Sequence, residues 1–118
     1  SIGTENQFLI DPDANIKDQI IIGKNTTISK NSIIKGPIII GKNCKIESSA
    51  RLGPHVSIGN NSRISQCNIQ DSIIMEDCNI NAKINLSNSI IAHDSQIDEH
   101  SIPKQYQFIL GERSQLKV

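Results

Sequence analysis

The sequence is dominated by aliphatic residues that recur with a period of six. They fall at every sixth position from Ile10 to Ile64, ten times in succession, and the steps continue at intervals of five or six up to Ile97. A helix turns by about 100° per residue, so a period of six would scatter these side chains over several faces. In a strand, residues an even number apart share a face. The period therefore predicts short strands joined by tight turns, which is typical of a parallel β-helix.

The stretch Ile21–Asn25, IIGKN, recurs as Ile39–Asn43, eighteen positions later. Three hexads make one coil of eighteen residues, so the two copies are expected to lie directly above one another. The coils then form a prism with three walls, in which single-residue losses fall in turns so that pairing along each wall stays in register. The first wall is expected to hold residues 20–22, 38–40, 56–58, 72–74 and 89–91. The second is expected to hold 26–28, 44–46, 62–64, 78–80 and 95–97, and the third 14–16, 32–34, 50–52, 67–69 and 84–86.

The composition supports an all-β fold. Isoleucine supplies 25 of the 118 residues, against five leucines and two valines, and this β-branched residue favours strands. Twelve asparagines suit the many turns that such a fold needs. We therefore expect one domain, a single-stranded parallel β-helix of about five coils with a C-terminal capping segment.

The six-residue period fails beyond residue 103. The segment Tyr106–Leu110 that follows is rich in aromatic residues, unlike the repeats. We expect residues 1–9 to form a linker or N-terminal cap, residues 10–103 the β-helix, and residues 104–118 a C-terminal cap over the last coil. Such a cap would cover a strand edge that is otherwise unpaired.

The charge pattern indicates neither nucleic acid nor membrane as a partner. Lysine plus arginine equals aspartate plus glutamate at 12 each, and no basic run is present. No apolar stretch approaches the roughly 18 residues of a membrane span. A soluble, cytoplasmic protein is expected. The sequence begins Ser1-Ile2-Gly3 without a methionine, which is compatible with a piece of a longer protein.

The three cysteines, Cys44, Cys67 and Cys78, fall on inward positions that the repeat reserves for small residues. Cys44 and Cys78 share a column two coils apart, about 9.6 Å, which is too far for a disulfide. No Cys-x-x-Cys spacing is present either. We therefore expect structural thiols and no metal site.

The three histidines, His55, His93 and His100, fall in turns on different corners of the prism. His55, within Leu52–Ile58, has the best claim to act as a general base, because it lies mid-prism beside a glycine and a serine. No carboxylate stands at a fixed spacing to orient it. A solvated turn residue is the simpler interpretation.

The outward residues of the first wall predict an oligomer interface. They form an apolar stripe, whereas the outward residues of the second wall are polar or charged. An exposed apolar surface of this length calls for a partner, and we expect a homo-oligomer with a trimer favoured over a dimer. In the alternative, the N-terminal segment or the C-terminal cap folds back over the stripe. The interface residues are Ile21, Ile39, Ser57, Ile73 and Ile90.

Several ordered segments carry a family resemblance. They are Ile34–Gly41 (IKGPIIIG), Leu52–Gly59 (LGPHVSIG), Ile69–Ile74 (IQDSII) and Phe108–Ser114 (FILGERS). In this order they resemble the C-terminal left-handed β-helix of long-form glucose-1-phosphate thymidylyltransferases, which are sugar-1-phosphate nucleotidyltransferases. The left hand of the helix is implied by this resemblance alone.

In that family a sugar-1-phosphate attacks a nucleoside triphosphate with help from Mg²⁺. This chemistry belongs to an N-terminal α/β domain with a Gly-rich loop of the G-x-G-x-R type, which this sequence does not contain. The resemblance therefore implies an accessory domain without a nucleotidyl-transfer site or cofactor of its own. Its partners would be the N-terminal catalytic domain and further copies of itself, and its roles oligomerisation and regulation.

The rival hypothesis is a hexapeptide acyltransferase, which would use acyl-coenzyme A to acetylate a sugar or amino sugar. Such β-helices commonly bind the coenzyme between subunits and use a histidine as the base, a role that would fall to His55. Two features count against it: the coils run without a loop insertion, and no Asn-x-Gly-Ala-Gly-Thr run is present. A purely structural scaffold is a third interpretation.

Overall fold

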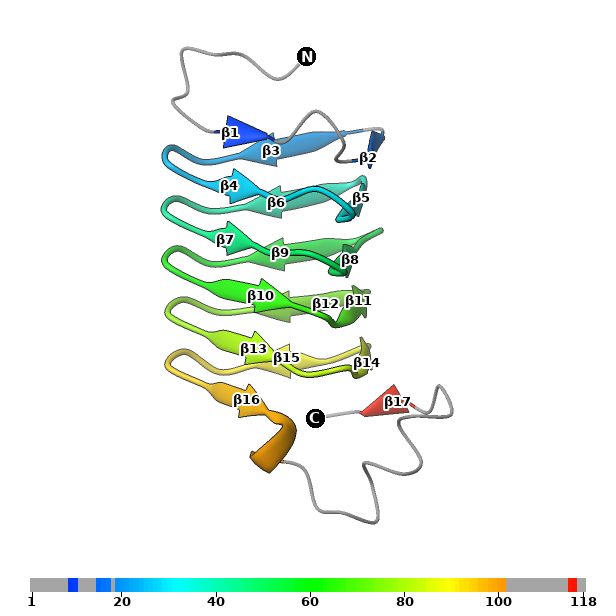
Figure 1. The fold of residues 1–118 in the computed structure, drawn as a ribbon, viewed down its shortest axis with the longest axis vertical. Helices are drawn as coiled ribbons and strands as arrows, with labels where there is room; N and C mark the ends of the chain where they lie inside the picture. Colours follow the sequence, from blue (N-terminus) through cyan, green and yellow to red (C-terminus); the bar gives the residue numbers. More distant parts are fainter. Residues whose placement is uncertain (1–8, 11–14, 18, 102–114, 117–118) are drawn as a thin grey trace.

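The computed structural model describes residues 9–10, 15–17, 19–101 and 115–116. Its strands pair in parallel and wind into a tall prism with three flat walls (Figure 1). Within these residues, no helix has both the length and the apolar character needed to span a membrane. The predicted all-β fold of about five coils is confirmed.

The first wall is a sheet of five strands. Its register places Ile21 opposite Ile39, Ile39 opposite Ser57, Ser57 opposite Ile73, and Ile73 opposite Ile90. Both IIGKN copies therefore lie one above the other, as predicted. The strands are β3 (Ile20–Ile22), β6 (Ile38–Ile40), β9 (Val56–Ile58), β12 (Ser72–Ile74) and β15 (Ile90–Ile91).

The second wall contains six strands, five of which overlap the predicted segments, three of them ending one residue later than predicted. The sixth, β1, pairs with β4 and places Leu9 opposite Thr27. The strands are β1 (Leu9–Ile10), β4 (Thr27–Ile28), β7 (Lys45–Ile46), β10 (Arg63–Ser65), β13 (Asn79–Asn81) and β16 (Gln96–Asp98). A short 3-10 helix, η2 (Glu99–Ser101), follows β16.

The third wall also contains six strands. Its last strand, β17, pairs with β14 and extends the wall past the fifth coil. Only β17 of the expected cap, and only Leu9 of the expected N-terminal linker, lie among the described residues. The strands are β2 (Asn15–Lys17), β5 (Ile33–Lys35), β8 (Arg51–Leu52), β11 (Asn68–Gln70), β14 (Asn85–Ser87) and β17 (Gln115–Leu116).

The helix is left-handed. In Figure 1 the chain descends from the N-terminus, runs rightward along the nearer second wall and returns leftward along the more distant first wall. Seen from the N-terminal end, this is an anticlockwise turn that moves away from the viewer. The hand implied by the resemblance is confirmed.

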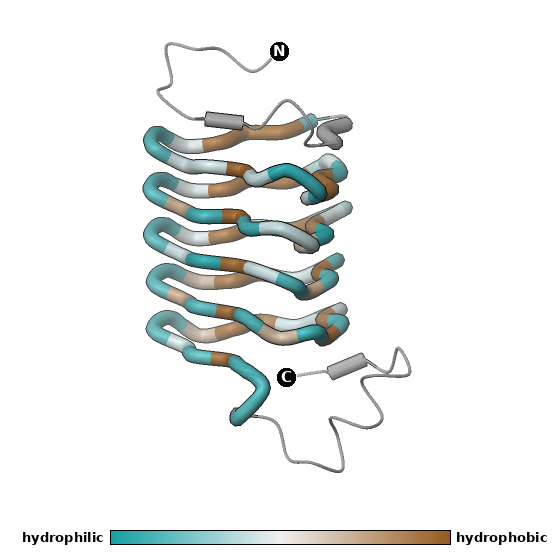
Figure 2. The backbone as a smooth tube through the Cα atoms, viewed as in Figure 1, coloured by the Kyte–Doolittle hydropathy of each residue, from teal (hydrophilic) through white to brown (hydrophobic). Residues whose placement is uncertain are grey.

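The core is a set of aliphatic files, mostly of isoleucine, one behind each wall. Behind the first wall, one buried side chain from each coil forms a continuous column. Each buried isoleucine contributes roughly 1.5–3 kcal/mol through the surface that it removes from water. The brown bands of Figure 2 follow these strands, while the turns between them are teal. The residues of this column are Ile22, Ile40, Ile58, Ile74 and Ile91.

The turns absorb the single-residue losses, as predicted. Because Ile58 pairs with Ile74 and Ile74 with Ile91, intervals of 16 and 17 residues still bring equivalent positions into line. Many corners close through a residue with positive φ, a conformation that asparagine and aspartate tolerate. At the corner after the first wall these residues are Asn25, Asn43, Asn61, Asp77 and Asp94, with φ between 57° and 62°.

Candidate functional site

The first wall carries an apolar stripe on its outer surface. Within each strand the side chains alternate, so the residue between two buried neighbours faces outward. The exposed fractions are 64% for Ile21, 51% for Ile39, 48% for Ile73 and 62% for Ile90. Ser57 lies at the centre of this column and is half-buried. The predicted exposure of the stripe is confirmed, and its role in assembly stays a prediction.

Met75 enlarges this apolar surface. It follows β12 directly, at the corner after the first wall, and is 42% exposed. The six-residue period gave no signal for it, because the period concerns inward positions. Its own outward position in a turn could have been found once the coils were assigned.

The second wall presents polar and charged side chains in the equivalent outward column. Thr27 pairs with Lys45, Lys45 with Arg63, Arg63 with Asn79, and Asn79 with Gln96. All five are half-buried or exposed. The prediction of a hydrated second wall is therefore confirmed.

His55 lies at the corner that leads into the first wall. Its backbone has φ of 60° and its N–H donates to the Pro37 carbonyl at 2.7 Å. Gly53, two residues earlier, has φ of 99°, and a Cβ there would lie 1.8 Å from the Lys35 carbonyl oxygen. Only glycine fits at position 53, and its conformation directs the backbone that leads to His55.

An open, largely apolar hollow of about 250 Å³ lies between His55 and the stripe. Ile39 and Ile73 form part of its wall, together with Ser57 from the strand between them. The exposed imidazole of His55 therefore borders the centre of the apolar surface.

His93 and His100 lie elsewhere. His93 is in the turn after the first wall of the last coil, where its Nε2 is 3.8 Å from an Asp94 carboxylate oxygen. His100 lies in η2, where its backbone N–H donates to Asp98 Oδ1 at 2.8 Å. The three histidines lie at different corners, as predicted, but His100 lies in a short 3-10 helix and not in a turn. Among residues 19–101, no group of three histidine, cysteine or acidic side chains is placed to hold a metal ion.

The cysteines are buried, as predicted, and two of them belong to a hydrogen-bonded corner column. Cys44 Sγ donates to the Gly59 carbonyl at 3.2 Å, and Cys78 Sγ donates to the Ala92 carbonyl at 3.2 Å. Ser62, between them, accepts from the Cys78 N–H at 3.2 Å. Each small polar side chain thus ties its own turn to the next coil.

Burial controls the chemistry of these thiols. It raises the pKa of Cys67 to about 12, and it also raises the pKa of Cys44 and of Cys78. A thiol with a raised pKa is a poor nucleophile at neutral pH, because the thiolate is the reactive form. The structural role expected for the three cysteines agrees with their surroundings.

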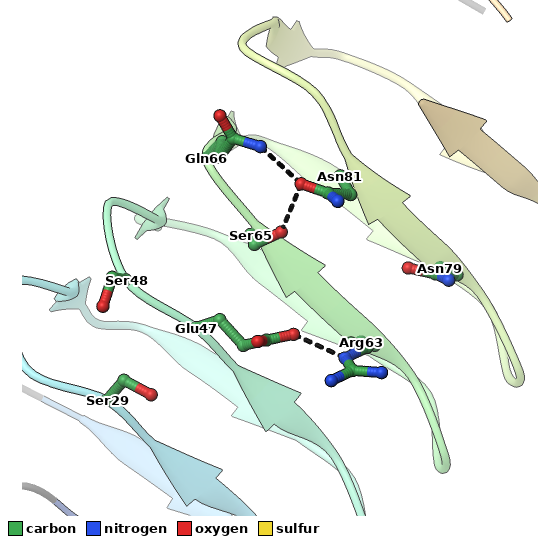
Figure 3. A pocket seen from close by; sticks show the side chains of 8 residues that line it. All are labelled: Ser29, Glu47, Ser48, Arg63, Ser65, Gln66, Asn79 and Asn81. Carbon is green, nitrogen blue, oxygen red and sulfur yellow. Dashed lines mark hydrogen bonds and ion pairs between the residues drawn. The ribbon is translucent and has the colours of Figure 1, made fainter. Parts of the chain in front are cut away.

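A polar groove of about 540 Å³ runs along the edge of the second wall (Figure 3). Arg63 pairs with Glu47 through its Nε, and Ser65 Oγ donates to Asn81 Oδ1 at 2.7 Å. Gln66 Nε2 donates to the same oxygen. The remaining amide and guanidinium N–H groups offer hydrogen-bond donors to a polar molecule.

A second sequence pattern, separate from the six-residue period of aliphatic residues, could have predicted this groove. A polar residue directly follows the inward isoleucine in successive coils of the second wall. These residues form one column at the groove, consisting of Ser29, Glu47, Ser65 and Asn81.

A family model described as GMPPB C-terminal domain matches residues 34–117, well over half of the chain. It represents the C-terminal β-helix domain of a nucleotidyltransferase. A comparison with curated protein sequences finds no match.

Three solved structures illustrate the structural similarity. The BC4754 gene product of Bacillus cereus is 18% identical, with a TM-score of 0.37 over 81% of this chain and 72% of that chain. The perosamine N-acetyltransferase of Caulobacter crescentus, an H141N mutant with CoA and GDP-perosamine, is 12% identical, with a TM-score of 0.37 over 79% and 48%. The acetyltransferase domain of PglB from Neisseria gonorrhoeae is 16% identical, with a TM-score of 0.28 over 79% and 49%. The chain spans about half the length of the latter two proteins.

Proposed function

Because the chain belongs to the GMPPB C-terminal domain family, we propose that it is the C-terminal β-helix domain of a sugar-1-phosphate nucleotidyltransferase. The observation that carries this proposal is the family match over residues 34–117, which includes most of the prism. The finer assignment is a glucose-1-phosphate thymidylyltransferase, from the resemblance of IKGPIIIG, LGPHVSIG and FILGERS. The whole protein would be cytoplasmic, and its N-terminal domain would carry out nucleotidyl transfer with Mg²⁺.

The role of this domain is assembly, and through assembly the regulation of the catalytic domain. The outer surface of the first wall supports this role, because four isoleucines in one column are each about half exposed or more. Leaving such a stripe in water forgoes the free energy that its burial would release. A homo-oligomer formed through the first wall would recover it.

Sedimentation of the isolated chain tests the assembly role. The double variant Ile39→Asp/Ile73→Asp puts two carboxylates on the stripe and should yield folded monomers. Lys45→Asp/Asn79→Asp is the matched control, because it changes the equivalent column of the second wall and should leave the mass unchanged. An unchanged mass in the stripe variant, with circular dichroism like that of the wild type, would rule out this wall as the interface.

Turnover assays test the division of labour between the domains. The isolated chain should not convert any sugar-1-phosphate and nucleoside triphosphate in the presence of Mg²⁺, because the proposal assigns that chemistry to the N-terminal domain. Nucleotidyl transfer by the isolated chain, abolished by heat and absent from a mock purification, would contradict the proposal.

An acyltransferase is the second candidate, favoured by the hollow that His55 shares with Ile39 and Ile73. An imidazole at the edge of an apolar hollow is a reasonable general base for a hydroxyl or amine. Incubation with acetyl-coenzyme A and amino sugars, followed by detection of free thiol, decides between the two. Turnover that is lost in His55→Ala and retained in His93→Ala would favour the acyltransferase.

A further inference from the structure

Charge is unevenly distributed along the axis of the prism. Residues 19–58 contain six lysines and arginines and one acidic residue, whereas residues 59–101 contain two basic and six acidic residues. The balance of the whole chain conceals this asymmetry. Within residues 19–101, the half of the prism nearer the N-terminus is therefore basic and the half nearer the C-terminus acidic.

The corner after the first wall shows the asymmetry coil by coil. The charged residues of this corner are exposed and flank the stripe along its length. The first two coils present a lysine, the third presents the half-buried Asn60, and the fourth and fifth present acidic residues. In coil order the series is Lys24, Lys42, Asn60, then Glu76 with Asp77, then His93 with Asp94.

The corner before the first wall repeats the pattern. Lys35 is the last residue of β5 on the third wall, with Gly36 and Pro37 between it and β6, whereas His55 and Asp71 directly precede β9 and β12; all three are exposed. Both edges of the stripe thus change from basic to acidic about the coil of Ser57. Ser57 is also the centre of the stripe, with two isoleucines on each side.

We propose that the partner of the first wall is a second copy of this chain in the antiparallel orientation, related by a two-fold axis that runs along β9 and passes by Ser57. This proposal rests on the assembly role proposed above and adds its orientation. A rotation about such an axis reverses the order of the coils and keeps the strand direction. Each corner then faces the same corner of the second copy.

The antiparallel arrangement pairs opposite charges in the coils on either side of the central one. The coil of Ile39 meets the coil of Ile73, so Lys42 faces Glu76 and Asp77 of the second copy. At the other edge Lys35, at the end of β5 on the third wall, lies level with Asp71 of the second copy. Lys24 faces Asp94 of the second copy in the outermost coils, and the apolar stripe is buried between these two rows of pairs.

Parallel arrangements pair like charges. A two-fold axis along the prism would bring Lys42 level with Lys35 of the second copy and set Glu76 against its Asp71. A three-fold axis along the prism likewise keeps every coil level with its equivalents. The charge order therefore favours an antiparallel dimer over the trimer that the stripe alone suggested. Electrostatic complementarity of this kind sets orientation more than affinity.

Distances between labels in the dimer test the orientation directly. Thr27 and Asn79 lie outward on the second wall, away from the proposed interface and three coils apart, which is about 14 Å along the axis. Thr27→Cys and Asn79→Cys chains would carry nitroxide labels, and wild type is the control because its thiols are buried. We expect the mixed 27-to-79 distance between chains to be shorter than the 27-to-27 distance.

A 27-to-27 distance shorter than the mixed distance would overturn the antiparallel orientation, and a particle of three chains would also overturn it. The failure of the assembly role is distinguishable, because the chain would then be monomeric or would keep its mass in Ile39→Asp/Ile73→Asp. Orientation and assembly are thus judged by separate measurements.

The sign of one charge reversal provides an independent check. In the antiparallel dimer Lys42→Glu turns two attractive contacts into repulsive ones, and dimer dissociation should become about tenfold easier. In a parallel dimer the same change would place a carboxylate opposite Lys35 and tighten association. Lys30→Glu is the control, because Lys30 is exposed in the turn after the second wall and should change the dissociation constant little. Tighter association of Lys42→Glu would overturn the proposal.

Discussion

The first and second walls have similar side chains on their inner faces and different side chains on their outer faces. Ile40 and Ile46 lie in successive strands, and each is at most 1% exposed within its own inward file. One residue before each of them the walls diverge, because Ile39 faces outward from the first and Lys45 from the second. The inward positions specify the coil, and the outward positions are free to specify what the coil contacts.

The largest expected effect tests whether the inward files of the first and second walls are packed equally tightly. Ile40→Ala and Ile46→Ala should each lower the free energy of unfolding by about 2–5 kcal/mol, because each leaves a cavity in a tightly packed file. Urea unfolding in the Ile39→Asp/Ile73→Asp background removes any contribution from assembly. A small loss at one site and a large loss at the other would show that the interiors differ.

The next effect tests whether water is excluded from the buried thiol of Cys67. Its pKa is raised by burial from 9.0 to about 12, so the folded chain keeps this proton where the unfolded chain loses it. Protonated Cys67 therefore makes its full contribution to the free energy of unfolding below pH 9. Between pH 9 and pH 12 this contribution declines by up to about 1.4 kcal/mol per pH unit.

The measurement is the difference between wild type and Cys67→Ala in urea unfolding from pH 8 to 10.5, which cancels the titration of other groups. The decline with pH should be shallower in the variant. Parallel profiles would indicate that water reaches Cys67.

A smaller effect tests the corner that joins the two walls. Ser62→Ala removes the hydroxyl that donates to the Met75 carbonyl and accepts from the Cys78 N–H. The free energy of unfolding should fall by about 1–3 kcal/mol, because the buried N–H loses its partner. Ser48→Ala, at an exposed position, should cost less than about 0.5 kcal/mol. Equal effects of the two changes would argue against the corner column.

The smallest effect concerns the outer surface of the second wall. Glu47→Gln removes the charge that pairs with Arg63, and both side chains are well exposed to solvent. The free energy of unfolding should change by less than about 1 kcal/mol, as is usual for exposed ion pairs. A larger change in thermal or urea unfolding would indicate that the polar groove also holds the coils together.

The period of six was sufficient to predict the three walls, their register and the exposure of Ile21, Ile39, Ile73 and Ile90. It succeeds because a side chain in a narrow prism has only two directions, and packing fixes which one. The groove could not be predicted in the same way. The contact of Gln66 with Asn81 joins a turn to a strand one coil away, and side-chain hydrogen bonds on a surface obey no period.

The change from basic to acidic residues along the stripe is present in the sequence, but it can be recognised only when each residue has been assigned to its coil. Lys42 and Glu76 are 34 positions apart and two coils apart in the prism. The role of His55 is a different case, because its turn could be predicted and its chemistry depends on what covers the neighbouring hollow.

The central claim is that the first wall is covered in the assembled protein and the second wall is not. Accessibility to a soluble paramagnetic agent, measured by NMR on isoleucine methyl groups and side-chain amides, tests it directly. We expect the methyl groups of Ile39 and Ile73 to be protected in the wild type and exposed in a dilute monomeric sample, while the Asn79 amide stays accessible in both. Equal accessibility of Ile39 and Ile73 in the two samples would contradict the claim.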